Sequence, residues 1–395
     1  MIPVQYNIRS LMVRKVTTAA TAGGIALVVF VFAAALMLGE GINRAFGSSG
    51  RQDVAVVLRN GSDSELSSGI NNDLVNLLKG QPGVSPDRAG EGGVPAVPGV
   101  IGEGVVVVSA EIDDGSGGTT NVLIRGMPAG GMAFRPEAKI VSGRAPAPGS
   151  NEVVVGKSIT GRFKGISPGQ SFDLRRNRPL QVVGVFEANG SAYESEVWGD
   201  LDVIRTSLGR SAGVSSVRVR LASNGQFSAF KSAVEADKQL GMKATRESDY
   251  FRKQSEQTSG FLVGLGIGVA ILFSLAAMIG AAITMNGAVA NRSKEIGTLR
   301  ALGFSRLSIL ISFVLEAIAL ALIGGVIGTA LVMLLASVEV SVLNFQTFSQ
   351  VVLSFRPTAA VVVTALVFSG VMGLVGGLFP AIRASRVSPV EAMRA

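Results

Sequence analysis

The chain has 395 residues, of which 48% are hydrophobic and only 16% are charged, and its formal net charge is +8. A soluble domain carries about 25% charged residues, so this composition indicates a membrane protein. The sequence contains no Cys and no His. Disulfide bonds, thiol catalysis and thiolate metal sites are therefore excluded, and the commonest zinc ligand and general base is missing.

The first 18 residues combine regularly spaced apolar side chains with basic ones. Four apolar residues fall on one helical face: Val4, Ile8, Leu11 and Met12. Arg9, Arg14 and Lys15 supply a basic flank. This pattern predicts a cytoplasmic amphipathic helix over residues 1–18 that lies at the membrane surface.

Four segments are long and apolar enough to cross the hydrocarbon core of a bilayer, which takes about 20 residues. They cover residues 19–38, 259–286, 307–338 and 357–382, and Glu316 is the only charged residue within them. The first segment is longer than the apolar region of a cleaved signal peptide, which favours a permanent membrane helix. We therefore expect an α-helical membrane protein with four transmembrane helices in a one-plus-three topology.

Basic residues are unevenly distributed along the flanks of these segments. Residues 1–18, 287–306 and 383–395 each have an excess of Lys and Arg, whereas residues 40–258 have 25 basic and 24 acidic side chains. Because cytoplasmic flanks carry such an excess, we expect a cytoplasmic loop at 287–306 and a cytoplasmic tail at 383–395. Residues 40–258 and a loop at 339–356 then lie outside. The near-neutral outer domain excludes a nucleic-acid-binding patch.

Residues 40–258 are expected to form an α+β domain. Strand-like runs occur at residues 53–59, 104–112 and 121–127, and a helical spacing of apolar residues covers residues 64–79. The Gly- and Pro-rich residues 81–104 predict an irregular loop. Residues 140–221 predict a small β-rich subdomain, from the runs EVVVG, QSFDL, LQVVGVFE and SVRVRLA. Residues 227–258 predict a stalk helix that continues into the second span.

No catalytic or metal-binding pattern emerges from the sequence. The tripeptide GKS at residues 156–158 resembles the end of a phosphate-binding loop, but that motif requires Gly at position 151, which is Asn. Two carboxylate pairs are interpreted as solvated turns: Asp113 with Asp114, and Glu194 with Glu196. We expect no catalytic residue, no metal site and no cofactor in this chain.

Small residues recur every four positions within three of the spans. The stripes are Gly260, Gly264 and Gly268 in the second span, Gly324 and Gly328 in the third, and Gly373 and Gly377 in the fourth. Such stripes let helix backbones approach closely in lipid. For the second span, packing within the chain and a dimer interface remain equal alternatives.

Glu316 in the third span is costly in hydrocarbon, where an ionised carboxylate costs about 2.5–3.5 kcal/mol on insertion scales. It lies about 15 Å along a helix from Arg306, which makes snorkelling difficult. We expect Glu316 to face protein, either protonated or hydrogen-bonded, in a structural helix–helix contact. A proton relay is the alternative interpretation.

The segment after the second span carries the most specific pattern in the chain. Residues 291–328 contain the order KEIGTLRALG, followed by a helix with an early Glu and a later Gly-rich turn. This order resembles the signature of the FtsX/MacB family of ABC transporter permeases. The matching positions are Lys294, Glu295, Ile296, Gly297, Arg300, Ala301, Leu302, Gly303, Glu316, Gly324 and Gly328.

Two further regions carry the same resemblance. The ending PAIRASRVSPVEAMRA at residues 380–395 is similar to the family's ending, and residues 142–201 are similar to the MacB-type periplasmic domain. The resemblance implies a multi-pass permease subunit of a bacterial inner membrane, with its large domain in the periplasm. It also implies a dimer that sits on two ATPase subunits. ATP and Mg²⁺ would bind to those partners, because this chain shows no fused ATPase domain.

The resemblance assigns roles to particular residues. In the family, the segment after the second span contacts the ATPase, so residues 294–303 form the expected coupling segment. Glu295, Arg300 and Gly303 lie within it. A periplasmic adaptor protein, an outer-membrane channel and membrane lipid are the other partners that the family suggests.

Two functions are compatible with this resemblance. The first is ATP-driven export or extraction of a hydrophobic or amphipathic cargo by mechanotransmission, in which closure of the dimer moves the stalks and reshapes the outer domains. The second is an FtsX-like scaffold that relays the state of the ATPase to an outer enzyme and transports nothing. The size of the outer domain favours the first. The cargo, and whether the dimer contains one or two kinds of chain, stay open at this point.

Overall fold

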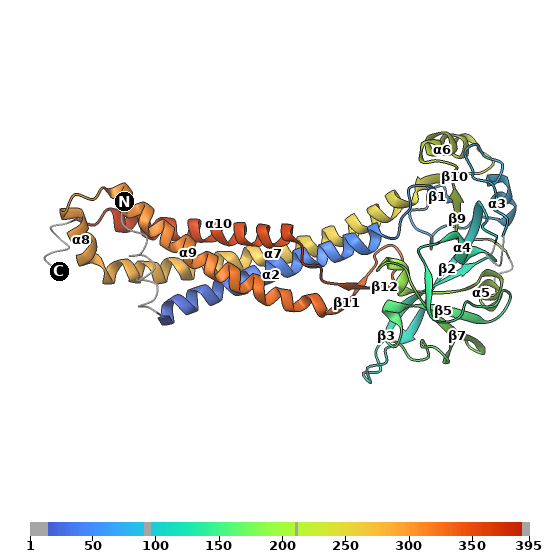
Figure 1. The fold of residues 1–395 in the computed structure, drawn as a ribbon, viewed down its shortest axis with the longest axis horizontal. Coiled ribbons are helices and arrows are strands. Elements are labelled where there is room, and N and C mark those ends of the chain that lie inside the picture. Colours follow the sequence, from blue (N-terminus) through green and yellow to red (C-terminus); the bar gives the residue numbers. More distant parts are fainter. Residues whose placement is uncertain (1–14, 91–95, 210–211, 389–395) are drawn as a thin grey trace. The chain divides into compact units, whose positions relative to one another are not determined.

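The computed structural model describes residues 15–90, 96–209 and 212–388, and the chain divides into two compact units (Figure 1). The helical unit comprises residues 1–41, 261–339 and 354–395, and the sheet unit comprises residues 42–260 and 340–353. Most of the predicted amphipathic helix over residues 1–18 lies outside the described residues. The same holds for residues 389–395 of the predicted tail.

Four long helices dominate the helical unit. Their bounds are α2 Lys15–Gly47, α7 Glu247–Asn291, α9 Arg306–Met333 and α10 Ala359–Ser385, and η4 (Leu334–Ser337) follows α9. Each long helix contains an 18-residue window with a mean hydropathy between 2.2 and 2.6. All four are therefore long and apolar enough to cross a membrane, as the sequence predicts. α2 and α7 contribute residues to both units.

Capping residues account for the starts of two of these helices. Ser305 precedes α9, and its Oγ accepts a hydrogen bond from the N–H of Ser308. Thr358 precedes α10, and its Oγ1 accepts one from the N–H of Val361. Each hydroxyl satisfies a backbone donor that would otherwise lack a partner at the helix start.

Small residues allow α9 to pack closely against α2 and α10. A Cβ built on Gly324 of α9 would lie 2.7 Å from the backbone oxygen of Ala22, and one built on Gly373 of α10 would lie 2.6 Å from Cβ of Ala321. The rings of Phe32 and Phe368 stack with their centroids 4.2 Å apart. In lipid, van der Waals contact of this kind holds helices together.

A ten-stranded sheet organises the sheet unit. Its strand order is β10-β1-β9-β2-β3-β8-β5-β7-β4, with β6 paired to β7. The strand bounds are β1 Val54–Arg59, β2 Val100–Glu111, β3 Thr119–Met127, β4 Lys139–Gly143, β5 Glu152–Gly156, β6 Ser171–Arg175, β7 Arg178–Glu187, β8 Glu196–Asp200, β9 Ser216–Arg220 and β10 Met242–Arg246. β2 joins two halves of the sheet, because its first residues pair with β9 and its later residues pair with β3.

Each half of the sheet has its own apolar core. The first core includes residues of α3 (Asn72–Leu78) and α6 (Phe227–Ala236), and the second includes residues of α5 (Leu201–Ser207). The remaining short helices are α4 Gly131–Phe134, η1 Lys157–Ile159, η2 Ala192–Ser195 and η3 Asn224–Gln226. The unit is α+β, which confirms the predicted fold class.

Three details of the predicted outer domain are wrong. Residues 227–258 do not form one stalk helix, because α6 ends at Ala236 and strand β10 (Met242–Arg246) precedes α7. The predicted helix over residues 64–79 is helical only at Asn72–Leu78, and Ile70 instead pairs with Val214 in an isolated bridge. The run at residues 216–222 was assigned to the β-rich subdomain, but β9 lies between β1 and β2 in the other half of the sheet. At Ile70, pairing with Val214 overrides the helical spacing, whereas β9 is a strand as predicted and only its partners in the sheet differ.

The predicted external loop at residues 339–356 contains a small sheet of its own. Its strands are β11 Glu339–Leu343 and β12 Gln350–Ser354. Within the sheet unit, Nδ2 of Asn344 donates to Oε1 of Gln254 at 3.1 Å. The N–H of Val352 donates to Oγ of Ser195 at 2.9 Å, and Val352 is buried in the second core. Residues 340–353 are therefore part of the folded domain.

Candidate functional site

The predicted coupling region, residues 287–306, is helical over most of its length. α7 extends to Asn291, and a further helix, α8, covers Ser293–Ala301. The two helices meet at Arg292, whose backbone angles (φ −108°, ψ 15°) lie outside the helical region. α8 contains Lys, Glu, Leu, Arg and Ala, all good helix formers, which accounts for a helix where the sequence analysis expected an open loop.

α8 has one buried side and one exposed side. Ile296 is 2% exposed and packs with Phe313 of α9 and Ala381 of α10 in an apolar cluster, and Gly297 is also buried. Five matched residues are exposed: Gly303, which follows α8, and four that we call the exposed face of α8, namely Lys294, Glu295, Ala301 and Leu302. Leu302, at the C-terminal end of α8, is 73% exposed although it is apolar.

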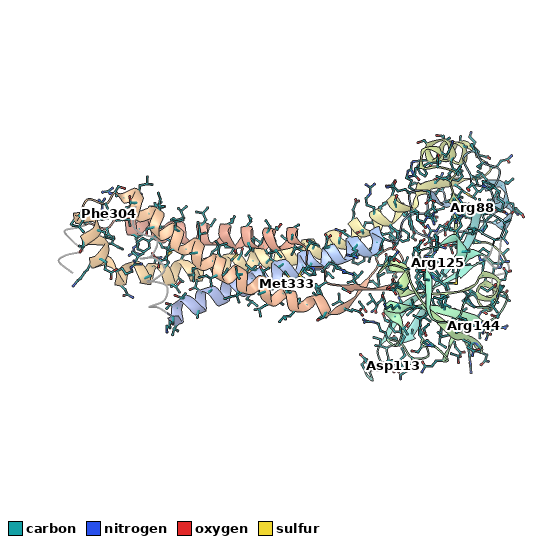
Figure 2. The ribbon with its side chains drawn as sticks, viewed as in Figure 1. Arg88, Asp113, Arg125, Arg144, Phe304 and Met333 are labelled. Carbon is teal, nitrogen blue, oxygen red and sulfur yellow. The ribbon has the colours of Figure 1, made fainter. Side chains whose placement is uncertain are left out.

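α8 ends in a complete Schellman turn. Gly303 has φ +96°, a left-handed conformation that glycine adopts without steric cost. The N–H of Phe304 donates to the carbonyl of Leu299 at 3.1 Å, and the N–H of Gly303 donates to that of Arg300 at 3.1 Å. Nη1 of Arg300 also donates to the carbonyl of Phe304, whose position Figure 2 labels. Gly303 therefore ends α8, and Arg300 supports the turn.

Glu316 of α9 forms an ion pair with Arg292. Nη1 of Arg292 lies 3.1 Å from Oε2 of Glu316, and the two side chains are 7% and 12% exposed. Nε of Arg292 also donates to Oε2 of Glu295 at 3.2 Å, and its guanidinium lies 5.3 Å from the ring centroid of Phe313. Glu316 faces protein and is hydrogen-bonded in this arrangement. The sequence shows Arg292 only as one of the basic residues of the 287–306 flank, and nothing in its local pattern indicates this contact.

The glycine stripes of α7 and α9 have different surroundings. A Cβ built on Gly260, Gly264 or Gly268 of α7 would meet no described atom within 4 Å. The apolar window of α7 is only 11% buried, compared with 50% for α2. The α9 glycines, in contrast, lie directly against α2. Within the described part of this chain, the α7 stripe therefore has no helix packed against it.

A second group of charged residues lies inside the sheet unit. We call it the buried ion cluster, and it consists of Glu65, Glu103, Arg125, Arg135, Glu196, Arg218 and Glu247, each at most 7% exposed. Arg125, labelled in Figure 2, pairs with three of its carboxylates. The Arg125 guanidinium donates to Glu65 at 3.0 Å and to Glu103 at 2.9 Å, and its Nε donates to Glu196 at 2.7 Å. Arg218 and Arg135 supply the other cations that pair with these carboxylates.

The alternation of side chains along strands explains how charges enter this core. In β9, Val217 and Val219 belong to the first apolar core, while Ser216, Arg218 and Arg220 lie on the other face of the sheet. Ser216 and Arg218 both donate to Oε1 of Glu65. The run SVRVRLA predicts only a strand in the sequence analysis, and its alternation of Arg with Val is the signal that could have indicated a buried charged face.

Arginine contacts keep the buried carboxylates ionised. Burial by itself would raise the pKa of Glu103. The guanidinium groups of Arg135, Arg125 and Arg218 outweigh that effect and lower the pKa of Glu103 to about 2. The same balance, with Arg125 and Arg218 as partners, lowers the pKa of Glu65.

The start of α7 is bonded to the buried ion cluster. Glu247, the first residue of α7, accepts a hydrogen bond from the hydroxyl of Tyr193 at 3.0 Å and lies 3.5 Å from Nη1 of Arg218. The ring of Tyr193 packs edge-on against Phe251, one turn further along α7. Ser49, just after α2, accepts a hydrogen bond from the backbone at residue 192. The sheet unit therefore holds the first turn of α7 through both charge and aromatic contacts.

The two carboxylate pairs of the sequence analysis have opposite outcomes. Asp113 and Asp114 are exposed in a turn, as expected. The interpretation of Glu194 and Glu196 as a solvated turn is wrong, because they are 5% and 7% exposed. Glu194 accepts two backbone N–H bonds at 2.6 and 2.7 Å, and Glu196 accepts the indole N–H of Trp198 at 2.7 Å.

Two family models match this chain. The MacB-like periplasmic core domain matches residues 18–237, and the FtsX-like permease C-terminal domain matches residues 267–389. The macrolide export ATP-binding/permease protein MacB of Neisseria gonorrhoeae is 27% identical over 231 residues, which cover 56% of this chain and 34% of that protein. MacB of Nitrobacter winogradskyi is 31% identical over 261 residues, covering 62% of this chain and 38% of that protein.

A shorter relative is also similar to this chain. An uncharacterised ABC transporter permease of Methanocaldococcus jannaschii is 26% identical over 227 residues, which cover 55% of this chain and 56% of that protein. The match thus spans between about a third and about half of the length of these relatives.

Proposed function

Since this chain belongs to the FtsX- and MacB-like permeases of ABC transporters, we propose that it works with separate ATPase subunits to export or extract a hydrophobic or amphipathic cargo. It is a multi-pass membrane protein with an extracytoplasmic domain. We assign it to a bacterial inner membrane, with α8 on the cytoplasmic side. ATP and Mg²⁺ would bind to the ATPase, and this chain would change its conformation in response.

The exposed face of α8 is the observation that carries this proposal. Ile296 and Gly297 hold α8 against the helical unit, which leaves Leu302 and the 58% exposed side chain of Glu295 at a surface that a soluble partner can reach. Leu302 is 73% exposed, and a partner that covered it would remove this apolar surface from water. Its position within the family motif favours the ATPase as that partner.

Continuity along α7 supports a mechanical coupling. α7 is one unbroken helix of 45 residues from Glu247 to Asn291. Arg292 follows directly and bonds to both Glu295 of α8 and Glu316 of α9. A shift of α8 caused by the ATPase would therefore act on α7 at one end, and Glu247 would pass the movement into the buried ion cluster at the other.

The second copy in the proposed dimer would pack on α7. The α7 stripe of Gly260, Gly264 and Gly268 lacks a neighbour among the described residues of this chain. Stripes of this spacing allow two helices to approach closely in lipid. We therefore propose that this side of α7 contributes to a dimer interface.

Substitutions on the exposed face of α8 test the coupling proposal. We expect Leu302→Ser and Glu295→Lys each to weaken binding of the ATPase subunit about tenfold or more, because they remove an apolar contact or reverse a charge at the interface. Binding and permease-stimulated ATP hydrolysis would be measured with purified components in nanodiscs. Leu77→Ser is the matched control, since Leu77 is 51% exposed on α3 of the sheet unit. Unchanged binding in both α8 variants would disprove this placement of the contact.

A further inference from the structure

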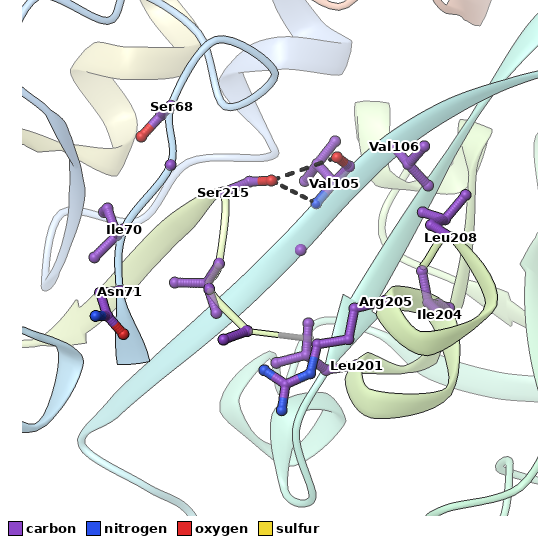
Figure 3. A pocket seen from close by; sticks show the side chains of 15 residues that line it. Ser68, Ile70, Asn71, Val105, Val106, Leu201, Ile204, Arg205, Leu208 and Ser215 are labelled. Carbon is purple, nitrogen blue, oxygen red and sulfur yellow. Dashed lines mark hydrogen bonds between the residues drawn. The ribbon is translucent and has the colours of Figure 1, made fainter. Parts of the chain in front are cut away.

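The sheet unit contains a cavity of about 360 Å³ that none of the proposed coupling contacts uses. Four elements form its walls: β2, the segment at residues 68–71, helix α5, and residues 212–215 before β9 (Figure 3). Small-molecule sites in proteins range from about 300 to 1,000 Å³. The cavity is therefore large enough for a ligand, at the lower end of that range.

Most of the cavity wall is apolar. Apolar side chains on the wall come from all four elements: Ile70, Val106, Ile204, Leu208 and Val214. Two glycines help to keep the space open. A Cβ built on Gly104 of β2 would lie 2.8 Å from Cδ1 of Leu201, and Gly213 has φ +94°, which disfavours any larger residue. Such a wall suits a hydrocarbon chain.

One basic side chain and one amide line the same cavity. Arg205 comes from α5 and Asn71 from the segment before α3, so the two polar groups come from different walls (Figure 3). Nη2 of Arg205 lies 2.6 Å from Oδ1 of Asp202. The Asp202 side chain is 73% exposed, whereas that of Arg205 is only 20% exposed. Exposed ion pairs contribute little, so Arg205 keeps the capacity to bind a second carboxylate.

We propose that this cavity binds a single-chain amphiphile with a carboxylate head group, such as a fatty acid. The apolar wall would enclose part of the chain. The planar guanidinium of Arg205 matches a carboxylate in shape and charge, and the amide of Asn71 can add a further hydrogen bond. The small volume favours one alkyl chain over the two chains of a phospholipid. This inference does not depend on an ATPase.

Photolabelling of the full-length protein tests the proposal. The probe is palmitic acid that carries a diazirine near the end of its chain, added to the protein in a nonionic detergent without ATP. We expect peptide mass spectrometry to locate the label on β2 and α5. Excess palmitate should displace the probe, whereas methyl palmitate, which lacks the charge, should not. Labelling confined to α2, α7, α9 and α10, or equal competition by the ester, would overturn the proposal.

Three variants sharpen this test. Arg205→Gln should lower the labelling of β2 and α5 about tenfold, because a charge-assisted hydrogen bond is lost. Val106→Trp should do the same by filling the cavity, and Asp202→Asn should preserve or increase labelling by removing a competing carboxylate. Arg144→Gln is the matched control, since the Arg144 side chain is 58% exposed elsewhere in the sheet unit. If Val106→Trp fails to fold, Arg205→Gln decides, and undiminished labelling of Arg205→Gln would overturn the proposal.

Discussion

Single residues determine the shape of the α8 turn. Gly303 adopts a left-handed conformation, and its N–H and that of Phe304 close the last turn of α8. An L-residue in that conformation costs roughly 1–2 kcal/mol. The Leu-Gly order of the family motif therefore has a structural reason, since it ends α8 where Leu302 becomes exposed.

We expect Gly303→Ala to destabilise α8 by about 1 kcal/mol, because alanine is strained at positive φ. Gly287→Ala is the control, since Gly287 lies inside α7 and its added Cβ would meet nothing within 4 Å. There the same substitution should be neutral or stabilising. Hydrogen exchange of the α8 amides would measure the difference, and equal exchange in the two variants would contradict this account of the turn.

The ion pair between Arg292 and Glu316 is the second contact at this scale. Glu316→Gln removes the buried carboxylate from Arg292 and leaves it with the exposed carboxylate of Glu295, and we expect a loss of about 2–3 kcal/mol in the free energy of unfolding. Glu295→Gln should cost less than about 1 kcal/mol, because Glu295 is 58% exposed. Thermal unfolding in detergent would compare the two variants. Similar losses would show that burial of the pair does not matter.

At the scale of whole helices, glycine spacing has two different uses. The stripe of α9 lets α2 approach its backbone, and the stripe of α7 has no neighbour among the described residues. The spacing is the same in both helices. Only the position of the neighbouring helices distinguishes packing within the chain from a surface available to a second copy.

We expect Gly324→Leu to destabilise the protomer strongly, because its side chain would meet the backbone of α2 at Ala22. Gly264→Leu should leave protomer unfolding unchanged and lower the dimer fraction. The larger side chain would block the close approach of a second helix on the side of α7 that has no neighbour among the described residues. Thermal unfolding and light scattering in detergent would report the two quantities. A dimer fraction unaffected by Gly264→Leu would rule out this side of α7 as the interface.

At the scale of the whole molecule, the buried ion cluster connects the sheet to the start of α7. Its four carboxylates and three arginines come from segments between residues 65 and 247. Because charges this deeply buried are costly unless all are paired, the cluster forms only when these segments fold together. It therefore makes the first turn of α7 and the sheet one cooperative structure.

The cluster predicts a loss of stability in acid. The pKa of Glu103 falls from its ordinary 4.5 to about 2 in the folded protein. Its contribution, on the order of 3 kcal/mol, is therefore present above about pH 4.5 and is lost as the pH falls toward 2. Trp198 is the only Trp in the chain and bonds to Glu196 of the cluster, so its fluorescence reports unfolding. Glu103→Gln should flatten this pH dependence, and an unchanged profile would contradict the assignment.

The sequence was sufficient for features that depend on local composition. Apolar length located the four spans, and the order KEIGTLRALG identified the family. The strands at residues 53–59, 104–112 and 121–127 also follow from local alternation. These properties need no knowledge of what lies opposite each residue in space.

Only the tertiary structure decided which residues are partners. Glu196 and Asp113 look alike in the sequence, yet one is buried against Arg125 and the other is exposed in a turn. The partner of Glu316 lies 24 residues away in the chain, at the junction of two helices. The physical reason is that the ionisation, burial and packing of a side chain depend on its neighbours in space, and those neighbours come from distant parts of the chain.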